Sequence, residues 1–208
     1  MSQVRDLQQG LTALGLHLSD TVQQQLLGYL ALLDKWNRVY NLTAIRDPRQ
    51  MVGYHILDGL AVLPHLWPSR WLDVGCGAGL PGMILAIARP DWEFVLLDSN
   101  SKKIGFVQQA IIQLGLKNVS AYCGRIECYK PAELFDGVIS RAFAELGDFV
   151  RLTAPLAKPG GKWAALKGHA EQELLSLPQM FDVEKMVSLH VPGVAATRSL
   201  VVVKRKGE

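Results

Sequence analysis

The chain has 208 residues, of which 49% are hydrophobic and 20% are charged, with a net charge of +3. This is the composition of a globular chain with one well-filled core. No apolar run reaches the ~20 residues of a membrane span, so we expect no membrane contact. The small positive charge permits an anionic partner without requiring one.

The amino-terminal residues and the cysteines indicate a cytoplasmic location. The first residues lack the apolar segment of a secretion signal. The three cysteines, Cys76, Cys123 and Cys128, form no Cys-x-x-Cys pair. An odd number of cysteines without a signal predicts reduced thiols, and buried thiols are favoured over a metal site or a nucleophile.

Residues 1–66 are predicted to be helical and to form an extension packed on the core. Leu26, Leu30 and Leu33 recur at helical spacing. Asp47-Pro48 is typical of a helix start, with the aspartate as N-cap and the proline at the first helical position.

Residues 67–208 are predicted to form the second unit, in which strands and helices alternate. The expected strands are Trp71–Val74, Glu93–Leu97, Val119–Cys123, Gly137–Ser140, Lys162–Leu166, Val183–Val191 and Ser199–Lys204. Helices are expected at 82–89, 102–115 and 145–156. Such alternation predicts a mainly parallel sheet with helices on both faces. The linker 192–197 is too short for a helix, so the last two strands should be antiparallel.

The most informative segment follows the first strand and reads Asp73-Val74-Gly75-Cys76-Gly77-Ala78-Gly79-Leu80-Pro81-Gly82. Glycines permit positive φ and let a ligand approach the backbone, and the next helix offers free N–H groups. The spacing also fits the Gly-x-Gly-x-x-Gly pattern of dinucleotide sites, with Asp98 about twenty residues on. A carboxylate at Asp73 repels a pyrophosphate but suits an ammonium or sulfonium group. We therefore favour S-adenosylmethionine, near Asp73, Gly75 and Gly77, over a dinucleotide or a structural glycine turn.

These patterns predict an α/β fold of the Rossmann-like class I methyltransferase type. Its mainly parallel sheet of seven strands would end in an antiparallel hairpin and carry the helical amino-terminal extension. Most dinucleotide-binding folds end instead with a parallel strand, which again favours a methyl donor.

Residues that end the predicted strands form the candidate site, because ligands bind at the carboxyl ends of parallel strands. Asp98 can accept from both ribose hydroxyls, or cap the helix that opens at Ser101-Lys102. Glu127 can accept from an adenine amino group while Ile126 packs against the ring, unless both lie in a solvated loop. Arg141 can hold an anion or the cofactor's carboxylate, or form a structural ion pair.

We predict no catalytic acid or base and no metal. The fourth strand is not followed by the Pro-Pro box of enzymes that methylate exocyclic amines, nor by the cysteine that pyrimidine C5 chemistry needs. A ring nitrogen needs neither, so catalysis reduces to placing nucleophile, methyl and sulfur in line, with Arg141 in a positioning role. Among the histidines His55 is the most suggestive, but a helix histidine bonded to a neighbouring carboxylate is an equal interpretation.

Besides the glycine loop, several specific segments point to one family. They are Tyr40-Asn41-Leu42-Thr43, His55-Ile56-Leu57-Asp58, Leu96-Leu97-Asp98-Ser99, Arg125-x-Glu127, Ser140-Arg141-Ala142 and Leu166-Lys167-Gly168. Through these segments the chain resembles, over nearly its whole length, the bacterial small-subunit (16S) ribosomal RNA guanine-N7 methyltransferases, once called glucose-inhibited division protein B. The resemblance implies S-adenosylmethionine as donor, S-adenosylhomocysteine as product, and cofactor contacts at Gly75, Leu80, Ile126, Glu127 and Arg141.

The implied acceptor is one guanine N7 in 16S rRNA or in a small-subunit particle. N7 is an acceptor that needs no deprotonation, and in RNA it must be exposed in a loop or bulge. Candidate RNA contacts are Asn41, His55, Lys167 and Arg198, and we expect a monomer. The alternatives are a methyltransferase acting on a small molecule or protein, and a non-catalytic nucleotide-binding module. The last is disfavoured because Asp73, Asp98 and Glu127 together suit a nucleoside with a cationic partner.

Overall fold

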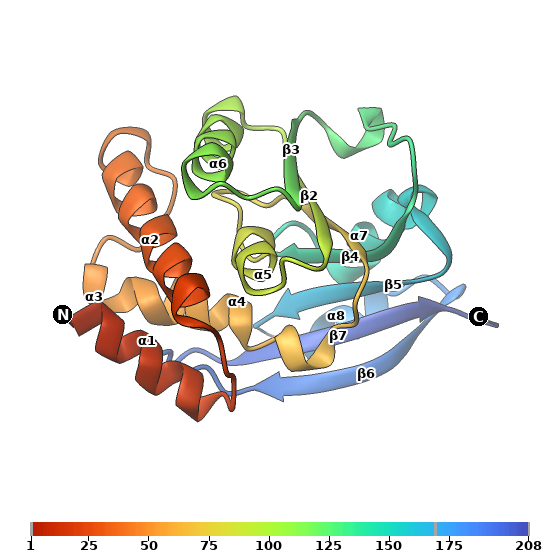
Figure 1. Cartoon of the computed structure of the whole chain (residues 1–208). Helices are drawn as coiled ribbons and strands as arrows, with labels where there is room; N and C mark the ends of the chain where they lie inside the picture. The colour runs from red at the N-terminus through yellow and green to blue at the C-terminus, as the bar shows by residue number, and fades with distance from the viewer. Residues whose placement is uncertain (1, 169, 208) are drawn as a thin grey trace.

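A seven-stranded sheet with the strand order β3-β2-β1-β4-β5-β7-β6 passes through the protein, as a computed structural model of residues 2–168 and 170–207 describes it (Figure 1). Strands β1 to β5 pair in parallel, whereas β7 is antiparallel to both β5 and β6. The predicted parallel sheet with a terminal antiparallel hairpin is confirmed. The strands are β1 (Arg70–Val74), β2 (Glu93–Asp98), β3 (Val119–Cys123), β4 (Phe135–Arg141), β5 (Ala157–Lys167), β6 (Phe181–Leu189) and β7 (Arg198–Arg205).

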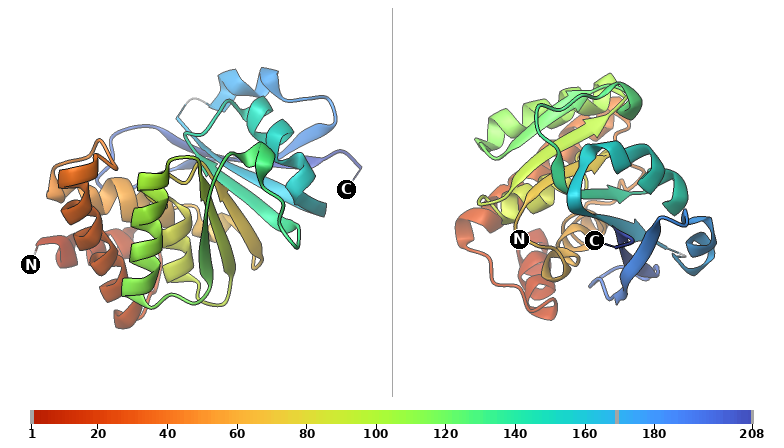
Figure 2. Two further views of the ribbon diagram at one scale, coloured as in Figure 1. Left: turned by 90° about the horizontal axis from the view of Figure 1, so that it is seen from above. Right: turned by 90° about the vertical axis from the view of Figure 1, so that its right-hand side faces the viewer.

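Helices cover both faces of this sheet, as the view from above shows (Figure 2). The helices after residue 66 are α5 (Gly82–Ala88), α6 (Ser101–Leu114), α7 (Leu146–Thr153) and the short α8 (Ala170–Glu173). The first three match the predicted helices, and α8, which lies between β5 and β6, has no counterpart among the predictions. None of the helices in the described ranges is long and apolar enough to cross a membrane.

The amino-terminal part is helical, as predicted. It contains α1 (Ser2–Ala13), α2 (Asp20–Tyr40), α3 (Pro48–Met51) and α4 (Asp58–Leu60). The Asp47 carboxylate accepts from the backbone N–H of Arg49 at 3.0 Å and caps α3, as the sequence predicted. The single helix expected after Pro48 is interrupted, because Val52–Leu57 forms a π-helical segment closed by the Asp58 N–H on the Gly53 carbonyl. Such π segments are frequent at functional sites.

The alternation of side chains along the strands divides the core into two layers. Trp71 faces α5 and the amino-terminal helices, whereas Leu72 and Val74 face α7. Helix α2 packs on α5 and α6, so residues before 66 share one continuous apolar cluster with that face of the sheet. The division into units 1–66 and 67–208 stays a prediction, since this cluster continues across the boundary.

Two glycines provide a paired stability prediction. A Cβ added at Gly137 in β4 would lie 2.5 Å from the ring of the fully buried Trp71, whereas one added at Gly105 in α6 meets no atom within 4 Å. We expect Gly137→Ala to lower the free energy of unfolding by about 1–3 kcal/mol through overpacking. Gly105→Ala should raise it by about 0.5–1 kcal/mol, because alanine favours helix interiors. Urea unfolding of both variants checks this, and an unchanged Gly137→Ala protein would contradict the packing argument.

Candidate active site

The glycine loop between β1 and α5 adopts a backbone that other residues rarely can. Gly75, Gly77 and Gly79 have φ values of 67°, 58° and 93°. The backbone N–H groups of Gly75 and Cys76 both donate to the Leu97 carbonyl, at 2.8 and 3.1 Å. The loop is therefore fixed to the carboxyl end of β2, where the sequence predicted a ligand site.

Tyr29 of α2 stabilises this loop through a hydrogen bond. Its side chain is fully buried, and its hydroxyl donates to the Ala78 carbonyl at 2.7 Å. Sequence analysis missed this contact. The only signal was a tyrosine on the buried leucine stripe of α2, because a buried tyrosine hydroxyl usually finds a hydrogen-bond partner.

Asp73 lies beneath the loop and not on a cavity wall. It shares a side of β1 with Trp71, and its Oδ2 accepts from the Gly82 N–H at 2.7 Å. Its Oδ1 has no hydrogen-bond partner among the described residues. Burial raises the pKa of Asp73 to about 7, and the Gly82 hydrogen bond opposes that rise. One buried acceptor is thus left for a cationic group, and direct contact of Asp73 with a ligand stays a prediction.

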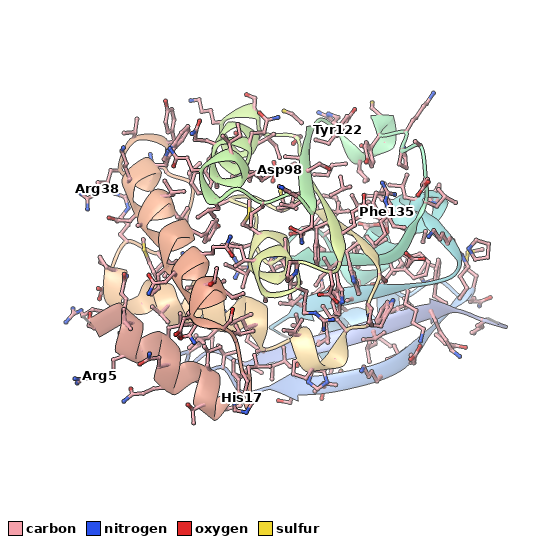
Figure 3. All side chains as sticks on the ribbon, viewed as in Figure 1. Arg5, His17, Arg38, Asp98, Tyr122 and Phe135 are labelled. Atoms are coloured by element: carbon pink, nitrogen blue, oxygen red, sulfur yellow. The ribbon has the colours of Figure 1, made fainter. Side chains whose placement is uncertain are left out.

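A cavity of about 440 Å³, here called the glycine-loop cavity, opens above Gly75 and the end of β2. Four predicted cofactor contacts line it: Gly75, Asp98, Ile126 and Glu127. Figure 3 labels Asp98 beside α6. The other lining residues are Leu97, Ser99, Lys103, Gly124, Arg125, Ala142 and Phe143.

Asp98 connects two loops at the floor of the glycine-loop cavity. Its Oδ2 accepts from the Gly77 N–H at 2.9 Å, and its Oδ1 accepts from the Asn100 N–H at 2.8 Å. The cap of α6 is Asn100, whose side-chain oxygen accepts from the Lys102 and Lys103 N–H groups. The interpretation of Asp98 as the helix cap is therefore wrong. A carboxylate has about four lone-pair sites, so its two oxygens can also accept from hydroxyl groups.

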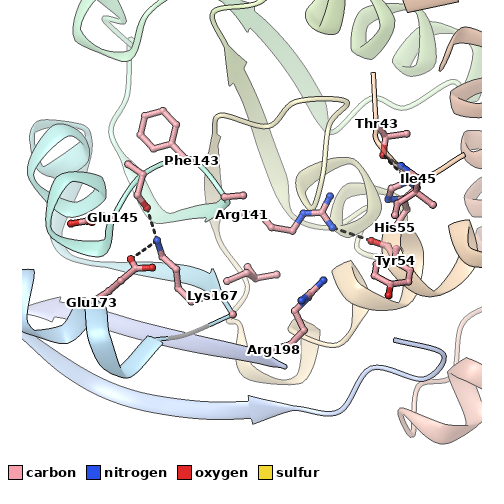
Figure 4. A pocket seen from close by; sticks show the side chains of 14 residues that line it. Thr43, Ile45, Tyr54, His55, Arg141, Phe143, Glu145, Lys167, Glu173 and Arg198 are labelled. Atoms are coloured by element: carbon pink, nitrogen blue, oxygen red, sulfur yellow. Dashed lines mark hydrogen bonds and ion pairs between the residues drawn. The ribbon is translucent and has the colours of Figure 1, made fainter. Parts of the chain in front are cut away.

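A second cavity of about 650 Å³, here called the arginine cavity, adjoins the first and is seen closely in Figure 4. Ala142 and Phe143 line both cavities. His55, Lys167 and Arg198, three of the four predicted RNA contacts, line the arginine cavity together with Arg141. The rest of its wall is Thr43, Ile45, Tyr54, Ala144, Glu145, Leu166, Gly168 and Glu173.

Asp58 joins two arginines at this cavity. Its side chain is 1% exposed, and it accepts from Arg141 Nη1 and Arg198 Nε, each at 2.7 Å. Arg141 also donates to the Tyr54 carbonyl at 3.0 Å. Arg141 was predicted as a cofactor contact but lies in the arginine cavity, because the buried carboxylate holds it there. The side chains of Arg141 and Arg198 remain 26% and 23% exposed, and both line the cavity.

His55 is buried, and its partner is not a carboxylate. Its Nε2 lies 3.3 Å from Thr43 Oγ1, and its Nδ1 has no partner in the described part of the chain. The interpretation of a histidine bonded to a neighbouring carboxylate is wrong, because Asp58 is taken by the arginines. Burial, with a contribution from Arg141, lowers the pKa of His55 to about 4.

Three other predicted contacts, Lys167, Asn41 and Leu80, already have partners within the protein, and of these three Lys167 alone lines one of the two cavities. Lys167 binds Glu173 at 2.6 Å and donates to the Ala144 carbonyl, so its ammonium group is already paired. Asn41 has a φ of 51°, ends α2, and accepts from Arg46 at 2.6 Å. Leu80 is buried within the glycine loop and donates its N–H to the Cys76 carbonyl at 2.8 Å. These contacts are structural, and any ligand contact at the three residues stays a prediction.

The strand order, the antiparallel β7, the glycine loop and the acid at the end of β2 define a Rossmann-like methyltransferase fold. The N-methyltransferase NodS from Bradyrhizobium japonicum, solved with S-adenosyl-l-homocysteine, has a TM-score of 0.55 at 17% identity, covering 90% of this chain and 100% of its own. TrmN from Thermus thermophilus has a TM-score of 0.56 at 18% identity, with coverages of 81% and 53%. These similarities show the fold.

The sequence comparisons identify the family. The model of the family rRNA small subunit methyltransferase G matches residues 22–201. The ribosomal RNA small subunit methyltransferase G of Laribacter hongkongensis is 49% identical over 202 residues, covering 97% of this chain and 98% of the relative. The protein of the same name from Neisseria meningitidis serogroup A is 48% identical, with coverages of 99% and 100%. The chain belongs to this family, and the resemblance inferred from sequence is confirmed.

The lowered pKa of His55 predicts a pH-dependent stability. The unfolded histidine titrates near pH ~6.5, above the folded value of about 4, so the unfolded state binds more protons between these values. Its contribution to stability is therefore complete above pH ~6.5 and lost as the pH falls toward about 4. Replacement His55→Gln should flatten the loss of unfolding free energy between pH 7 and pH 5, as urea titrations can measure. The exposed His17→Gln is the matched control, and equal slopes in all three proteins would refute the assignment.

Proposed function

We propose that this chain transfers a methyl group from S-adenosylmethionine to N7 of one guanine in 16S rRNA of the small ribosomal subunit, in the cytoplasm. The observation that carries the proposal is the pair of adjoining cavities. Gly75 and Asp98 line one of these cavities, and Arg141 and Arg198 line the other. The names of the relatives support ribosomal RNA as the acceptor over a small molecule or protein.

The glycine-loop cavity suits an adenosine with a cationic arm. Its volume of about 440 Å³ lies in the ~300–1,000 Å³ range of small-molecule sites. All three of Asp98, Ile126 and Glu127 line this cavity. In our proposal Asp98 accepts from the ribose hydroxyls, Ile126 packs on the base, and Glu127 accepts from its amino group. Asp73 lies beneath the loop, off the cavity wall, and its Oδ1 has no partner among the described residues, so we expect its negative charge to favour the ammonium end of the donor through the loop.

The arginine cavity suits a nucleotide of RNA. Arg141 and Arg198 line it with partly exposed side chains, beside Thr43, Tyr54 and His55. The other charged residues of its wall are Glu145 and the paired Lys167 and Glu173. Guanidinium groups bind phosphate with fixed geometry, which positions a nucleotide without reading its sequence.

Arg38 on α2 points outward, as Figure 3 shows, and is paired with Asp34 at 2.7 Å. It lines neither cavity.

In the proposed reaction the protein acts by positioning the sulfonium methyl group and guanine N7. The bound donor supplies a methyl on a sulfonium, which is already an activated leaving group. Guanine N7 has a free lone pair, so no side chain needs to remove a proton. The lowered pKa keeps His55 neutral near pH 7 and makes its imidazole a weak proton acceptor. Holding the reacting atoms in line about 3–3.5 Å apart can then supply much of the rate enhancement.

The direct test of the acceptor is a map of 7-methylguanine in 16S rRNA from cells with and without this protein. We expect one modified position to disappear and to return when the gene is restored. Transfer of methyl only to a small molecule or a protein would overturn the proposal.

The negative charge of Asp98 leads to a prediction about the affinity for S-adenosylmethionine. Replacement Asp98→Asn leaves one acceptor oxygen, which can keep the hydrogen bond from the Gly77 N–H while the one from the Asn100 N–H is lost, and it removes the negative charge near the ribose. A charge-assisted bond is worth roughly 1.5–3 kcal/mol, so S-adenosylmethionine affinity should fall roughly 10- to 150-fold in calorimetry. The matched control is Asp91→Asn, an exposed partner of Arg89 that lines neither cavity. Unchanged donor affinity in Asp98→Asn, with tight binding of a nicotinamide dinucleotide, would contradict the site.

A second functional prediction concerns pH. Under single-turnover conditions with saturating donor and RNA, the rate should be nearly flat between about pH 6 and 8.5, because no general base operates. The ionisation of Asp73, whose pKa is about 7, should appear instead as donor affinity that rises between about pH 6 and 7.5. Asp73→Asn should abolish that rise. A rate that climbs through pH ~6.5 and loses this slope in His55→Ala would require a base and withdraw the N7 assignment.

A further inference from the structure

Phe143 occupies the boundary between the two cavities. It lines both the glycine-loop cavity and the arginine cavity. A Cβ added at Gly75 would lie 2.5 Å from Phe143 Cδ2 and 3.1 Å from its Cβ, so the side chain packs directly on this glycine. The ring is half-buried, and it follows Arg141 by two residues at the end of β4 (Figure 4).

The backbone on either side of Phe143 has unusual features. Ala142, which precedes it, is exposed and has a φ of 58°, a conformation that non-glycine residues rarely adopt. The Ala144 carbonyl, which follows it, accepts from Lys167, and Lys167 is in turn paired with Glu173 at 2.6 Å. Strained backbone persists only where its surroundings over-determine it, and it gathers at functional sites.

Because Phe143 lies at the boundary between the two cavities, it can contact a molecule bound in either of them. If donor and acceptor occupy the two cavities, the methyl must cross where the cavities adjoin, and the shared wall is formed by Ala142 and Phe143. Ala142 offers only a methyl group. Phe143 offers a ring, and proteins commonly hold an unstacked RNA base on an aromatic face.

We propose that Phe143 positions the acceptor: its ring, which packs on Gly75 and lines both cavities, stacks on the guanine in the arginine cavity. This inference rests on the proposed methyl transfer to rRNA. The base plane is then set by the ring, and N7 is directed across the boundary toward the sulfonium methyl. N7 donates its lone pair to the methyl carbon as the carbon–sulfur bond breaks, and the bonding electrons leave with the sulfur.

The experiment compares Phe143→Leu and Phe143→Tyr in the full chain, with the rRNA or subunit particle that the wild-type protein methylates. With saturating donor and RNA, Phe143→Leu should lower the single-turnover rate roughly 5- to 150-fold, which corresponds to the ~1–3 kcal/mol of one base–aromatic stack. Phe143→Tyr should restore most of that rate. Donor affinity, measured by calorimetry without RNA, should stay within about threefold in both variants, since the ring stacks on the acceptor.

Tyr40→Leu is the matched control, because Tyr40 is an exposed aromatic residue of α2 that lines neither cavity. It should keep the wild-type rate. Full activity of Phe143→Leu would overturn the inference. So would a loss of donor affinity as large as the loss of rate, which would make Phe143 a wall of the donor site alone. A wild-type protein that binds donor but transfers no methyl to rRNA would instead refute the proposed function.

Discussion

The buried carboxylate of Asp58 is the constraint on which the arginine cavity depends. Removing a carboxylate from water costs several kcal/mol unless cations and hydrogen bonds compensate it. Its partners, Arg141 and Arg198, are 83 and 140 residues away in sequence. Satisfying this one charge therefore brings α4, the end of β4 and the start of β7 together. The cavity wall is a consequence of that pairing, and it leaves guanidinium surface exposed because two cations share a single anion.

In the glycine loop two carboxylates fix backbone N–H groups, whereas in the arginine cavity two guanidinium groups share one carboxylate. Asp73 and Asp98 accept from the backbone N–H groups of Gly82 and Gly77, and Tyr29 donates to the Ala78 carbonyl. Backbone groups that a ligand would otherwise have to order are already fixed, which reduces the entropy cost of binding. The helical amino-terminal part thus contributes to the glycine loop through Tyr29 and to the arginine cavity through His55 and Asp58.

Local patterns in the sequence predicted the strands, the glycine loop and the closing hairpin, because periodicity and glycine spacing are local properties. Pairings between distant residues carry no such signal. The sequence therefore offered a structural ion pair for Arg141 without identifying Asp58 as its partner, and the contact of Phe143 with Gly75 was not predicted. Asn41, a predicted RNA contact, ends α2, since asparagine tolerates positive φ. The alternation of Trp71 and Asp73 along β1 could have placed the Asp73 side chain beneath α5, off the cavity wall.

Three consecutive residues at the end of β4 join these features. Arg141 holds the buried carboxylate, Ala142 turns the chain through positive φ, and Phe143 covers Gly75. Strand β4 lies between β1 and β5, and Arg141 at its end pairs with Leu166 of β5, whereas the pairing with β1 reaches only Ile139. The sheet thus fixes the backbone of Arg141, and Asp58 fixes its side chain. The buried ion pair of the arginine cavity and the boundary between the two cavities therefore meet on one short segment, 141–143.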